Sequence, residues 1–443
     1  MSNAPALNER IIEPSLVGAT TMPTVYYAGR SGYAIESDGV YIPLSETAVG
    51  QHLRKAGVKR EEVANLLCDI RTQNFVAYIG PVAGYQAGLH ISEDNNRPFL
   101  VTTGPNLIEG AEGDWSFLRG FFAELFGGGE QHDAVMAWLR QARRNLIVGK
   151  RRPLPAAVLV GPRNCGKSLF SEVTRLVLGG RSAPAFAALS GLSSFNADII
   201  GAELLTIDDE IASKDSRART ALAQGIKKHF FAPAVRAEAK GRDAVTLRPV
   251  QAVVIAVNDE PEHLQVLPML DDSVVDKISL FSCQRASLDG QDDRDAIAQL
   301  VREEMPALVY YLDQSEHPAS LRDKRTGCAA WQHPDVVAAL QSISPEEQMR
   351  ELMQQCYAIT EAVQSRGGWH GSATELQRSL LENPVTSQAA RSLLRYTSTC
   401  GTYLGRLQAS RRASMDRATI HGVTRWTITS LNPPQAKQGR LNI

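Results

Sequence analysis

The stretch that decides the fold runs from residue 156 to residue 178 and reads AAVLVGPRNCGKSLFSEVTRLVL. Residues 156–160 form a short apolar run, which is the pattern of a buried parallel strand. Residues 161–168 match G-x-x-x-x-G-K-[ST] in full, and the residues that follow have helical periodicity. Strand, glycine loop and helix in this order give the motif its structural context.

The motif predicts a loop that binds phosphate groups. Glycines let backbone N–H groups turn toward phosphate oxygens, and the start of the helix adds partial positive charge. Lys167 would neutralise phosphate oxygens, and the Ser168 hydroxyl would coordinate Mg²⁺. The predicted cofactor-binding residues are Gly161, Pro162, Arg163, Asn164, Cys165, Gly166, Lys167, Ser168 and Leu169.

Two further apolar runs end in polar residues. Residues 203–210 (ELLTIDDE) deliver acids where a Mg²⁺-and-water site needs them. Asp208 is expected in the Mg²⁺ shell, while Asp209 or Glu210 would orient or deprotonate the attacking water. The sequence does not separate those two roles. Residues 250–257 form another apolar strand that ends in Asn258, which either serves the site or caps the following turn.

Basic residues are concentrated around these elements. Residues 234–247 predict a hairpin that turns at 240–243, so that Lys240 and Arg242 form a basic tip. Such a tip suits contact with DNA, although it also fits an ordinary exposed turn. Between Asp133 and Lys167 there are eight basic residues and no acid, which indicates either a solvated helix face or a surface that meets phosphate.

This ordered set of elements resembles superfamily 3 helicases, and more closely the helicase domains of phage and plasmid primase-helicases. The resemblance covers about residues 100–290. It implies an AAA+-like ATPase that works as a ring, usually a hexamer, with ATP and Mg²⁺ between subunits and hairpins that grip one DNA strand. It also implies that Asn258 contacts the γ-phosphate or the attacking water.

One position departs from that pattern. The family places an Arg, which acts on the neighbouring subunit's ATP, where this chain has Lys277. Either Arg285, Arg217 or Arg219 takes that role, or hydrolysis is slow, because a Lys acts only as a point charge. The chain contains no recognisable primase catalytic domain, so any primase would be a separate protein.

The last part of the chain resembles a winged-helix module. An N-cap pattern opens a helix at residue 372, residues 387–408 continue as a longer helix region, and residues 418–428 predict a hairpin. From Arg391 to the end there are nine basic residues and one acid. We therefore expect DNA contacts from Arg406, Arg411 and Arg412, with protein contacts as the alternative.

Composition sets outer bounds. Among 443 residues, 47 are Lys or Arg and 48 are Asp or Glu, so the balance excludes a histone-like basic protein. No apolar run is long enough for a membrane span, and the first residues do not form a signal peptide, so a cytoplasmic protein is expected. Six cysteines without a CxxC pair argue for a reducing compartment and against structural zinc.

The prediction is an α/β protein with a P-loop AAA+-like core and a parallel sheet. It would begin with an α+β accessory domain (1–106), in which three short strands precede one helix at residues 45–67. A helical lead-in (107–152), the ATPase core (153–290), a helical linker or lid (291–370) and a winged-helix domain (371–443) would follow. The predicted function is an ATP-dependent DNA helicase or translocase of phage or mobile-element replication. The alternatives are a non-unwinding DNA-dependent ATPase (an initiator, a loader or an antiviral sensor) and a nucleotide-gated scaffold with crippled hydrolysis.

Overall fold

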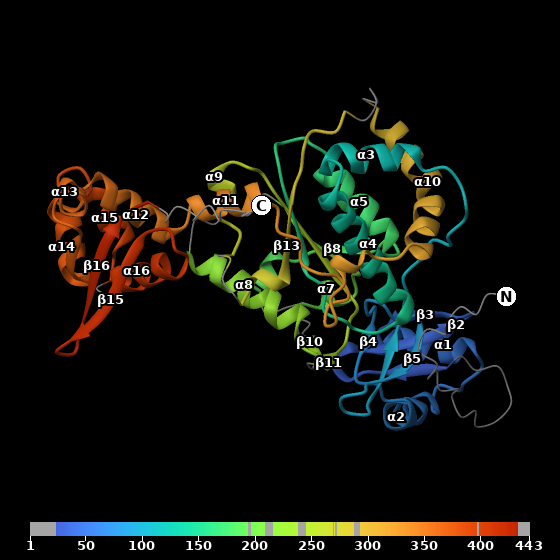
Figure 1. Cartoon of the computed structure of the whole chain (residues 1–443). Helices are drawn as coiled ribbons and strands as arrows, with labels where there is room; N and C mark the ends of the chain where they lie inside the picture. Colours follow the sequence, from blue (N-terminus) through green and yellow to red (C-terminus); the bar gives the residue numbers. More distant parts are fainter. Residues whose placement is uncertain are drawn as a thin grey trace. The chain divides into compact units, whose positions relative to one another are not determined.

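The computed structural model describes residues 24–193, 196–208, 216–237, 245–268, 270, 273–287, 293–396 and 398–432, with only the backbone of 197 and 216–219. Contacts divide the chain into two compact units, residues 1–337 and 338–443 (Figure 1). In the part of the chain so described, no helix is long and apolar enough to cross a membrane.

A five-stranded parallel sheet forms the centre of the first unit. Its strand order is β13-β7-β12-β9-β8. Every residue of β7 and β12 is buried, as the apolar runs predict. The expected α/β fold with a parallel sheet is confirmed. The strands are β7 (Ala156–Val160), β8 (Ser182–Pro184), β9 (Leu204–Ile207), β12 (Ala252–Val257) and β13 (Ile278–Ser282).

Four helices pack together on this sheet and enclose the main core (Figure 1). Aromatic side chains fill it: the rings of Phe126 and Phe170 meet edge to face at 5.2 Å. The buried Trp138 donates its Nε1–H to the Pro155 carbonyl at 2.7 Å, which ties a helix to the start of β7. The helices are α3 (Ser116–Phe126), α4 (Glu130–Val148), α5 (Lys167–Val177) and α10 (Arg294–Gln314).

A second group of shorter elements in this unit includes α8 (Ser216–Phe230). Helix α6 (Phe186–Leu189) crosses it so closely that a Cβ at Gly225 would collide with the Leu189 carbonyl. The hairpin expected over 234–247 is present, although its tip residues Lys240 and Arg242 lie outside the described residues. Its strands are β10 (Val235–Ala237) and β11 (Val245–Leu247), and α7 (Ala197–Ile200), α9 (Pro261–Leu264) and the 3₁₀ turn η3 (Val275–Lys277) complete the group.

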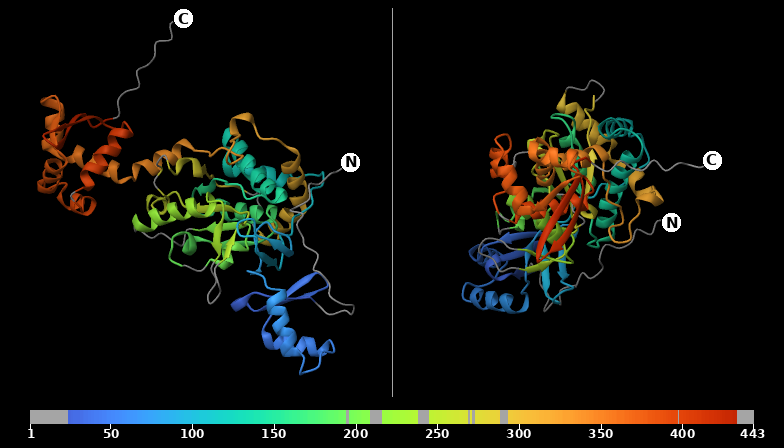
Figure 2. Two further views of the ribbon diagram at one scale, coloured as in Figure 1. Left: turned by 90° about the horizontal axis from the view of Figure 1, so that it is seen from below. Right: turned by 60° about the vertical axis from the view of Figure 1, so that its left-hand side comes forward.

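The N-terminal part carries two small sheets, the antiparallel β1-β2-β3 and the mixed β4-β6-β5 (Figures 1 and 2). The single helix expected over 45–67 is wrong: two helices form, and Gly57 lies between them with a φ of 96°. The elements are β1 (Val25–Tyr27), β2 (Tyr33–Ser37), β3 (Val40–Leu44), α1 (Glu46–Lys55), α2 (Val63–Gln73), β4 (Ile79–Gly80), β5 (Gly88–Ile91) and β6 (Pro98–Val101).

The second unit combines helices with a three-stranded sheet of order β14-β16-β15. The predicted N-cap at Ser372 is a capping box with Glu375. The helix region expected over 387–408 is two helices, and the hairpin is longer than expected. The elements are α12 (Pro345–Gln355), α13 (Tyr357–Ser365), β14 (Trp369–Ser372), α14 (Ala373–Glu382), α15 (Ser387–Leu393), α16 (Thr399–Ala409), β15 (Ser414–Ile420) and β16 (Val423–Ser430), and α11 (Pro334–Ser342) precedes them.

Candidate functional site

Residues 161–166, which we call the glycine loop, connect the carboxyl end of β7 to the first turn of α5. Both of its glycines are required by their surroundings. A Cβ at Gly161 would collide with the Cys283 carbonyl, and one at Gly166 would lie 2.9 Å from the Phe121 ring. Gly166 also has a φ of 118°, which disfavours any side chain. The loop therefore lies with its backbone close to β13 and α3.

Lys167 is the point at which the predicted site residues meet. Its side chain is buried, and Nζ donates to the carbonyls of Gly161 at 2.7 Å and Pro162 at 2.9 Å. It also donates to Asn258 Oδ1 at 3.1 Å, across 91 residues of sequence. Asn258 directly follows β12, the strand paired with β7. The structure thus brings together Lys167 and Asn258 at one edge of the sheet.

A cavity of about 930 Å³ opens over the glycine loop. The loop and the start of α5 form one side, from Arg163 to Leu169. The other side comes from α10, a segment for which the sequence predicts only a helical linker or lid. Its contribution is an apolar strip flanked by two basic residues, namely Ile297, Ala298, Val301, Arg294 and Arg302.

Charged contacts hold α10 in place over the loop. The Glu304 carboxylate accepts from the backbone N–H of Phe117 at 3.1 Å and of Leu118 at 2.8 Å, in the first turn of α3. Farther along, Asp313 forms a two-point ion pair with Arg143 of α4, at 2.8 and 3.1 Å. These contacts hold the middle and the C-terminal end of α10, and its buried apolar side chains pack into the main core, so the helix has a fixed place beside the loop.

The acidic edge lies one strand beyond Asn258. Asp208 follows β9, which pairs with β12, and its side chain is exposed. Asp209 and Glu210 lie outside the described residues. Ser168 lines the cavity, but Asp208 is not among the lining residues. Ser168 and Asp208 offer hard oxygen ligands at the same sheet edge, which suits a Mg²⁺ ion that keeps waters and phosphate oxygens as its other ligands.

Within the described ranges, no group of three His, Cys, Asp or Glu side chains is placed to hold a metal ion.

The basic run before the glycine loop is largely structural. The sequence predicted either a solvated helix face or a surface that meets phosphate. Arg143 fits neither interpretation, because it is buried and pairs with Asp313. Arg151 donates to the carbonyls of Pro249 at 2.5 Å and Ala232 at 3.2 Å, and also to that of His229. Burial lowers the pKa of Arg151 to about 10. The Arg151 guanidinium thus satisfies carbonyls at the end of α8 and after the hairpin.

A second cavity, of about 780 Å³, lies between α6, α8 and the base of the β10–β11 hairpin. Two exposed basic side chains, Lys228 and Arg236, are among its lining residues. The buried Ser190 hydroxyl, also in the lining, has no hydrogen-bond partner. The described lining thus contributes two basic side chains and an unpaired hydroxyl to this cavity.

The residues proposed to act on a neighbouring subunit's ATP lie in different parts of the chain and in different surroundings. Lys277 pairs with Asp276 at 2.6 Å and lies 5.4 Å from the centre of the Phe231 ring. Arg285 is exposed, and its neighbour Ala286 lines the cavity over the glycine loop. The side chains of Arg217 and Arg219 are outside the described set. Of the two described candidates, Arg285 is the more accessible.

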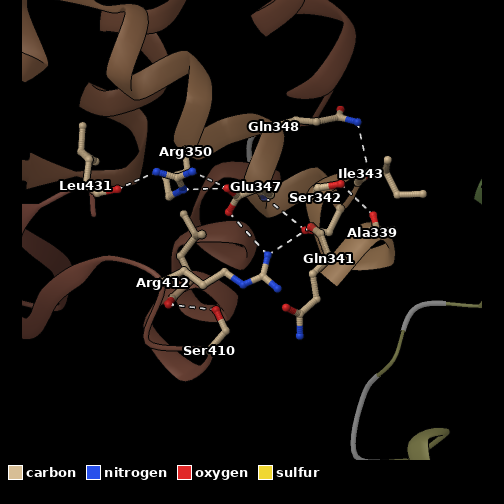
Figure 3. A network of polar contacts seen from close by, with 12 residues as sticks. Ala339, Gln341, Ser342, Ile343, Glu347, Gln348, Arg350, Ser410, Arg412 and Leu431 are labelled. Atoms are coloured by element: carbon tan, nitrogen blue, oxygen red, sulfur yellow. Dashed lines mark hydrogen bonds and ion pairs between the residues drawn. The ribbon is translucent and has the colours of Figure 1, made fainter. Parts of the chain in front are cut away.

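In the second unit, the three predicted DNA-binding arginines differ. Arg412 donates to the Gln341 carbonyl at 3.1 Å and pairs with Glu347 at 3.5 Å, and Glu347 also binds Arg350 (Figure 3). Arg412 therefore ties α12 to the chain before β15. Arg406 is exposed but pairs with Glu346 at 3.6 Å, whereas Arg411 is exposed at a φ of 53°.

Comparison with known proteins supports the fold. A family model described as "Family of unknown function (DUF5906)" matches residues 159–273. No curated protein matches. A solved structure of the NrS-1 C-terminal region in its apo form is 12% identical, with a TM-score of 0.55, over 92% of this chain and 96% of that one. The chain shares this overall fold.

Two helicase structures are more distant. JCV helicase matches with 13% identity and a TM-score of 0.32, over 55% of this chain and 65% of that one. The active helicase Cch of SCCmec type IV matches with 11% identity and the same TM-score of 0.32, over 93% and 78%. Scores at this level do not establish a shared topology.

The contacts of Arg151 give a local prediction. We expect Arg151→Met to speed amide exchange across the end of α8 by roughly tenfold to a hundredfold, because the carbonyls it serves lose a charged donor worth about 2 kcal/mol. Hydrogen exchange with mass spectrometry measures this on peptides that cover residues 223–237. The adjacent exposed Lys150, changed to Met, is the matched control, and equal exchange in both variants would contradict the assigned role.

Proposed function

We propose that this chain is a Mg²⁺-dependent ATPase that moves along DNA, a superfamily 3-like helicase or translocase acting as a ring in the replication of a phage or mobile element. The observation that carries the proposal is the hydrogen bond between Lys167 and Asn258, at the mouth of a cavity large enough for a nucleotide. A cation and an amide at the carboxyl edge of a parallel sheet suit phosphate chemistry.

The cavity has two chemically different sides, as a nucleotide has. The glycine loop offers backbone N–H groups and the Lys167 ammonium for the phosphates. The apolar strip of α10, with Ile297, Ala298 and Val301, offers a surface for the base. Leu176 extends that surface from α5. ATP would therefore lie with its phosphates on the loop and its base against α10.

Hydrolysis would use the contacts already present at the loop. Lys167 would exchange the carbonyls of Gly161 and Pro162 for phosphate oxygens, since these are the acceptors its ammonium now uses. Asn258 would then orient the γ-phosphate or the attacking water. Ser168 and Asp208 would hold Mg²⁺, which supplies charge that offsets the phosphate charge. Asp209 or Glu210 would orient or deprotonate the water.

Single-stranded DNA would bind at the hairpin. The lining of the cavity at the hairpin base includes Lys228 and Arg236, two exposed basic side chains of the kind that contacts a phosphate backbone. Lys240 and Arg242 would continue this surface at the tip. In a ring of identical subunits, these surfaces would face a common channel, and Arg285 would reach the neighbouring subunit's ATP.

The second unit would bind duplex DNA as a winged helix. Its order of strand, helices and hairpin, with β16 between β14 and β15, supports this interpretation. The β15–β16 ribbon is exposed on both faces from Asp416 to Arg425, as a wing would be. Arg406 on α16 and Arg411 after it are exposed, as are Arg417 and Arg425 on the ribbon itself. A separate primase remains a proposed partner.

The ATPase prediction rests on the glycine loop. Lys167→Ala should lower DNA-stimulated ATP hydrolysis at least about 100-fold, because the phosphates lose their buried cation. Asn258→Ala should lose hydrolysis by about 10-fold or more while ATP affinity changes only severalfold. Phosphate-release kinetics and calorimetry measure the two effects. Full activity of Lys167→Ala, with exposed Lys150→Ala as control, would end the proposal.

The base-binding wall can be tested apart from the loop. We expect Ala298→Trp to weaken ATP binding at least about tenfold, because the indole fills the space assigned to the base. Binding of tripolyphosphate, which has no base, should change by less than about twofold. Titration calorimetry compares both ligands, with Gln299→Trp, exposed on the same helix outside the cavity, as control. Equal loss for both ligands would contradict this assignment.

The DNA surface predicts a salt signature. Lys228→Ala and Arg236→Ala should each weaken binding to a single-stranded oligonucleotide and reduce the slope of log K against log salt by about 0.7, as expected for one lost phosphate contact. Fluorescence anisotropy at several salt concentrations measures the slope. Lys59→Ala, an exposed lysine between α1 and α2, is the control and should match the wild type.

Strand displacement then separates the helicase from the non-unwinding ATPase. A forked duplex with ATP and Mg²⁺ should be opened by the wild type and not by Lys167→Ala. ATP-dependent DNA binding without any displacement would favour an initiator, a loader or a sensor.

A further inference from the structure

Two cysteines from distant parts of the sequence meet beneath the glycine loop. Cys165 belongs to the loop, and Cys283 follows β13. The backbone N–H of Cys283 donates to the Val160 carbonyl at 2.6 Å, and that of Ala286 donates to the Cys165 carbonyl at 3.2 Å. Residues 283–286 thus lie along the loop, which brings Cys283 next to Cys165.

The two thiols have opposite acidities. The hydrogen bond from Cys283 lowers the pKa of Cys165 to about 6, despite its burial, and the Lys167 ammonium adds to this effect. Lys167 Nζ lies 3.8 Å from Cys165 Sγ. Burial raises the pKa of Cys283 well above its ordinary value. Near neutral pH the pair therefore consists of a thiolate at Cys165 and a protonated thiol at Cys283.

Cys165 also has a route to small molecules. Its side chain is buried, but it is one of the residues that line the cavity over the glycine loop. Cys328 and Cys400 are buried too, and burial raises the pKa of each to about 12, so they lack the thiolate that reacts. The exposed thiol among the described cysteines is Cys68.

From this arrangement we propose that Cys165 and Cys283 form a redox pair, in which a hydroperoxide that enters the cavity oxidises Cys165 and Cys283 then closes a disulfide across the base of the glycine loop. In the first step, the Cys165 sulfur attacks a peroxide oxygen, the O–O bond breaks, and an alcohol, or water from hydrogen peroxide, leaves after taking up a proton. Cys165 is then a sulfenic acid.

The second step uses the neighbouring thiol. The Cys283 sulfur attacks the Cys165 sulfur, the S–O bond breaks, and water leaves with the Cys283 proton. The two thiols lose two electrons, which the hydroperoxide accepts. The disulfide would fasten the loop to the end of β13 and remove the thiolate beside Lys167. Oxidation of the two cysteines would therefore change the surroundings of Lys167, the residue that the proposed function assigns to phosphate binding.

Thiol mapping on the full chain tests the pair. The Cys68→Ser variant, which lacks the exposed thiol, is treated with hydrogen peroxide, quenched by alkylation and mapped by mass spectrometry. We expect loss of two thiols, recovery of one peptide pair joined through Cys165 and Cys283, and reversal by dithiothreitol. The rate at Cys165 should exceed that at Cys328 and Cys400 by about 100-fold or more, following the thiolate fractions.

Single substitutions separate the two steps. With Cys283→Ser added, oxidation should stop at a sulfenic acid on Cys165 that dimedone traps, and with Cys165→Ser added, Cys283 should stay reduced. The proposal is overturned if Cys165 reacts no faster than Cys400, or if no Cys165–Cys283 linkage forms in the variant that retains both cysteines.

One further arm rests on the proposed function. ATP with Mg²⁺, added before the peroxide, should slow disulfide formation about tenfold, since a nucleotide on the loop covers Cys165. If the disulfide forms at the same rate with and without ATP, the nucleotide site is contradicted while the thiol pair stands.

Discussion

Parallel pairing of β7 with β12 on one side and with β13 on the other is the constraint on which the site depends. The register places Val160 beside both Val257 and Ser282, so the chain leaves all three strands at the same level. Gly161, Asn258 and Cys283 are consequently neighbours, although more than a hundred residues separate the first from the last. A slip of one residue in the β7–β12 pair would turn the side chains after β12 to the other face of the sheet and separate Asn258 from Lys167. A slip in the β7–β13 pair would displace Cys283 in the same way.

The second wall of the site is fixed by charge rather than by sheet pairing. Helix α10 comes more than a hundred residues after the glycine loop, yet Glu304 binds the start of α3 and Asp313 binds Arg143 on α4. Because α3 and α4 pack into the same core as β7, the apolar strip on α10 keeps its place relative to the loop. Preorganisation of this kind reduces the entropy that a ligand must overcome on binding.

The sequence was sufficient where the signal is local. The apolar runs predicted β7, β9 and β12. The continuous helix expected from residue 45 failed because Gly57 takes a left-handed φ, a backbone choice that apolar spacing does not reveal. The motif placed Lys167 in the loop, but only the fold shows that its ammonium also reaches Asn258.

Long-range features could not be predicted in the same way. The run of basic residues before residue 167 predicted an exposed basic surface. In the structure, Arg143 binds a carboxylate and Arg151 binds carbonyls inside the fold. Cysteine spacing gave no sign that Cys165 and Cys283 meet, since their contact depends on the β7–β13 register. The helical periodicity of residues 294–314 does not predict that their apolar strip lines the cavity over the glycine loop.

The steric role of the two loop glycines affects which residues would be retained if a related protein lost its catalytic activity. Gly161 is required by the Cys283 carbonyl and Gly166 by Phe121 and by its own backbone angle, whether or not any phosphate is ever bound. Lys167, too, satisfies two loop carbonyls on its own account. A descendant that had lost catalysis could therefore retain the whole motif as a folding requirement. Substitutions would accumulate first at positions that the fold does not require, such as Ala298 on the cavity wall, where a polar residue would replace an apolar one.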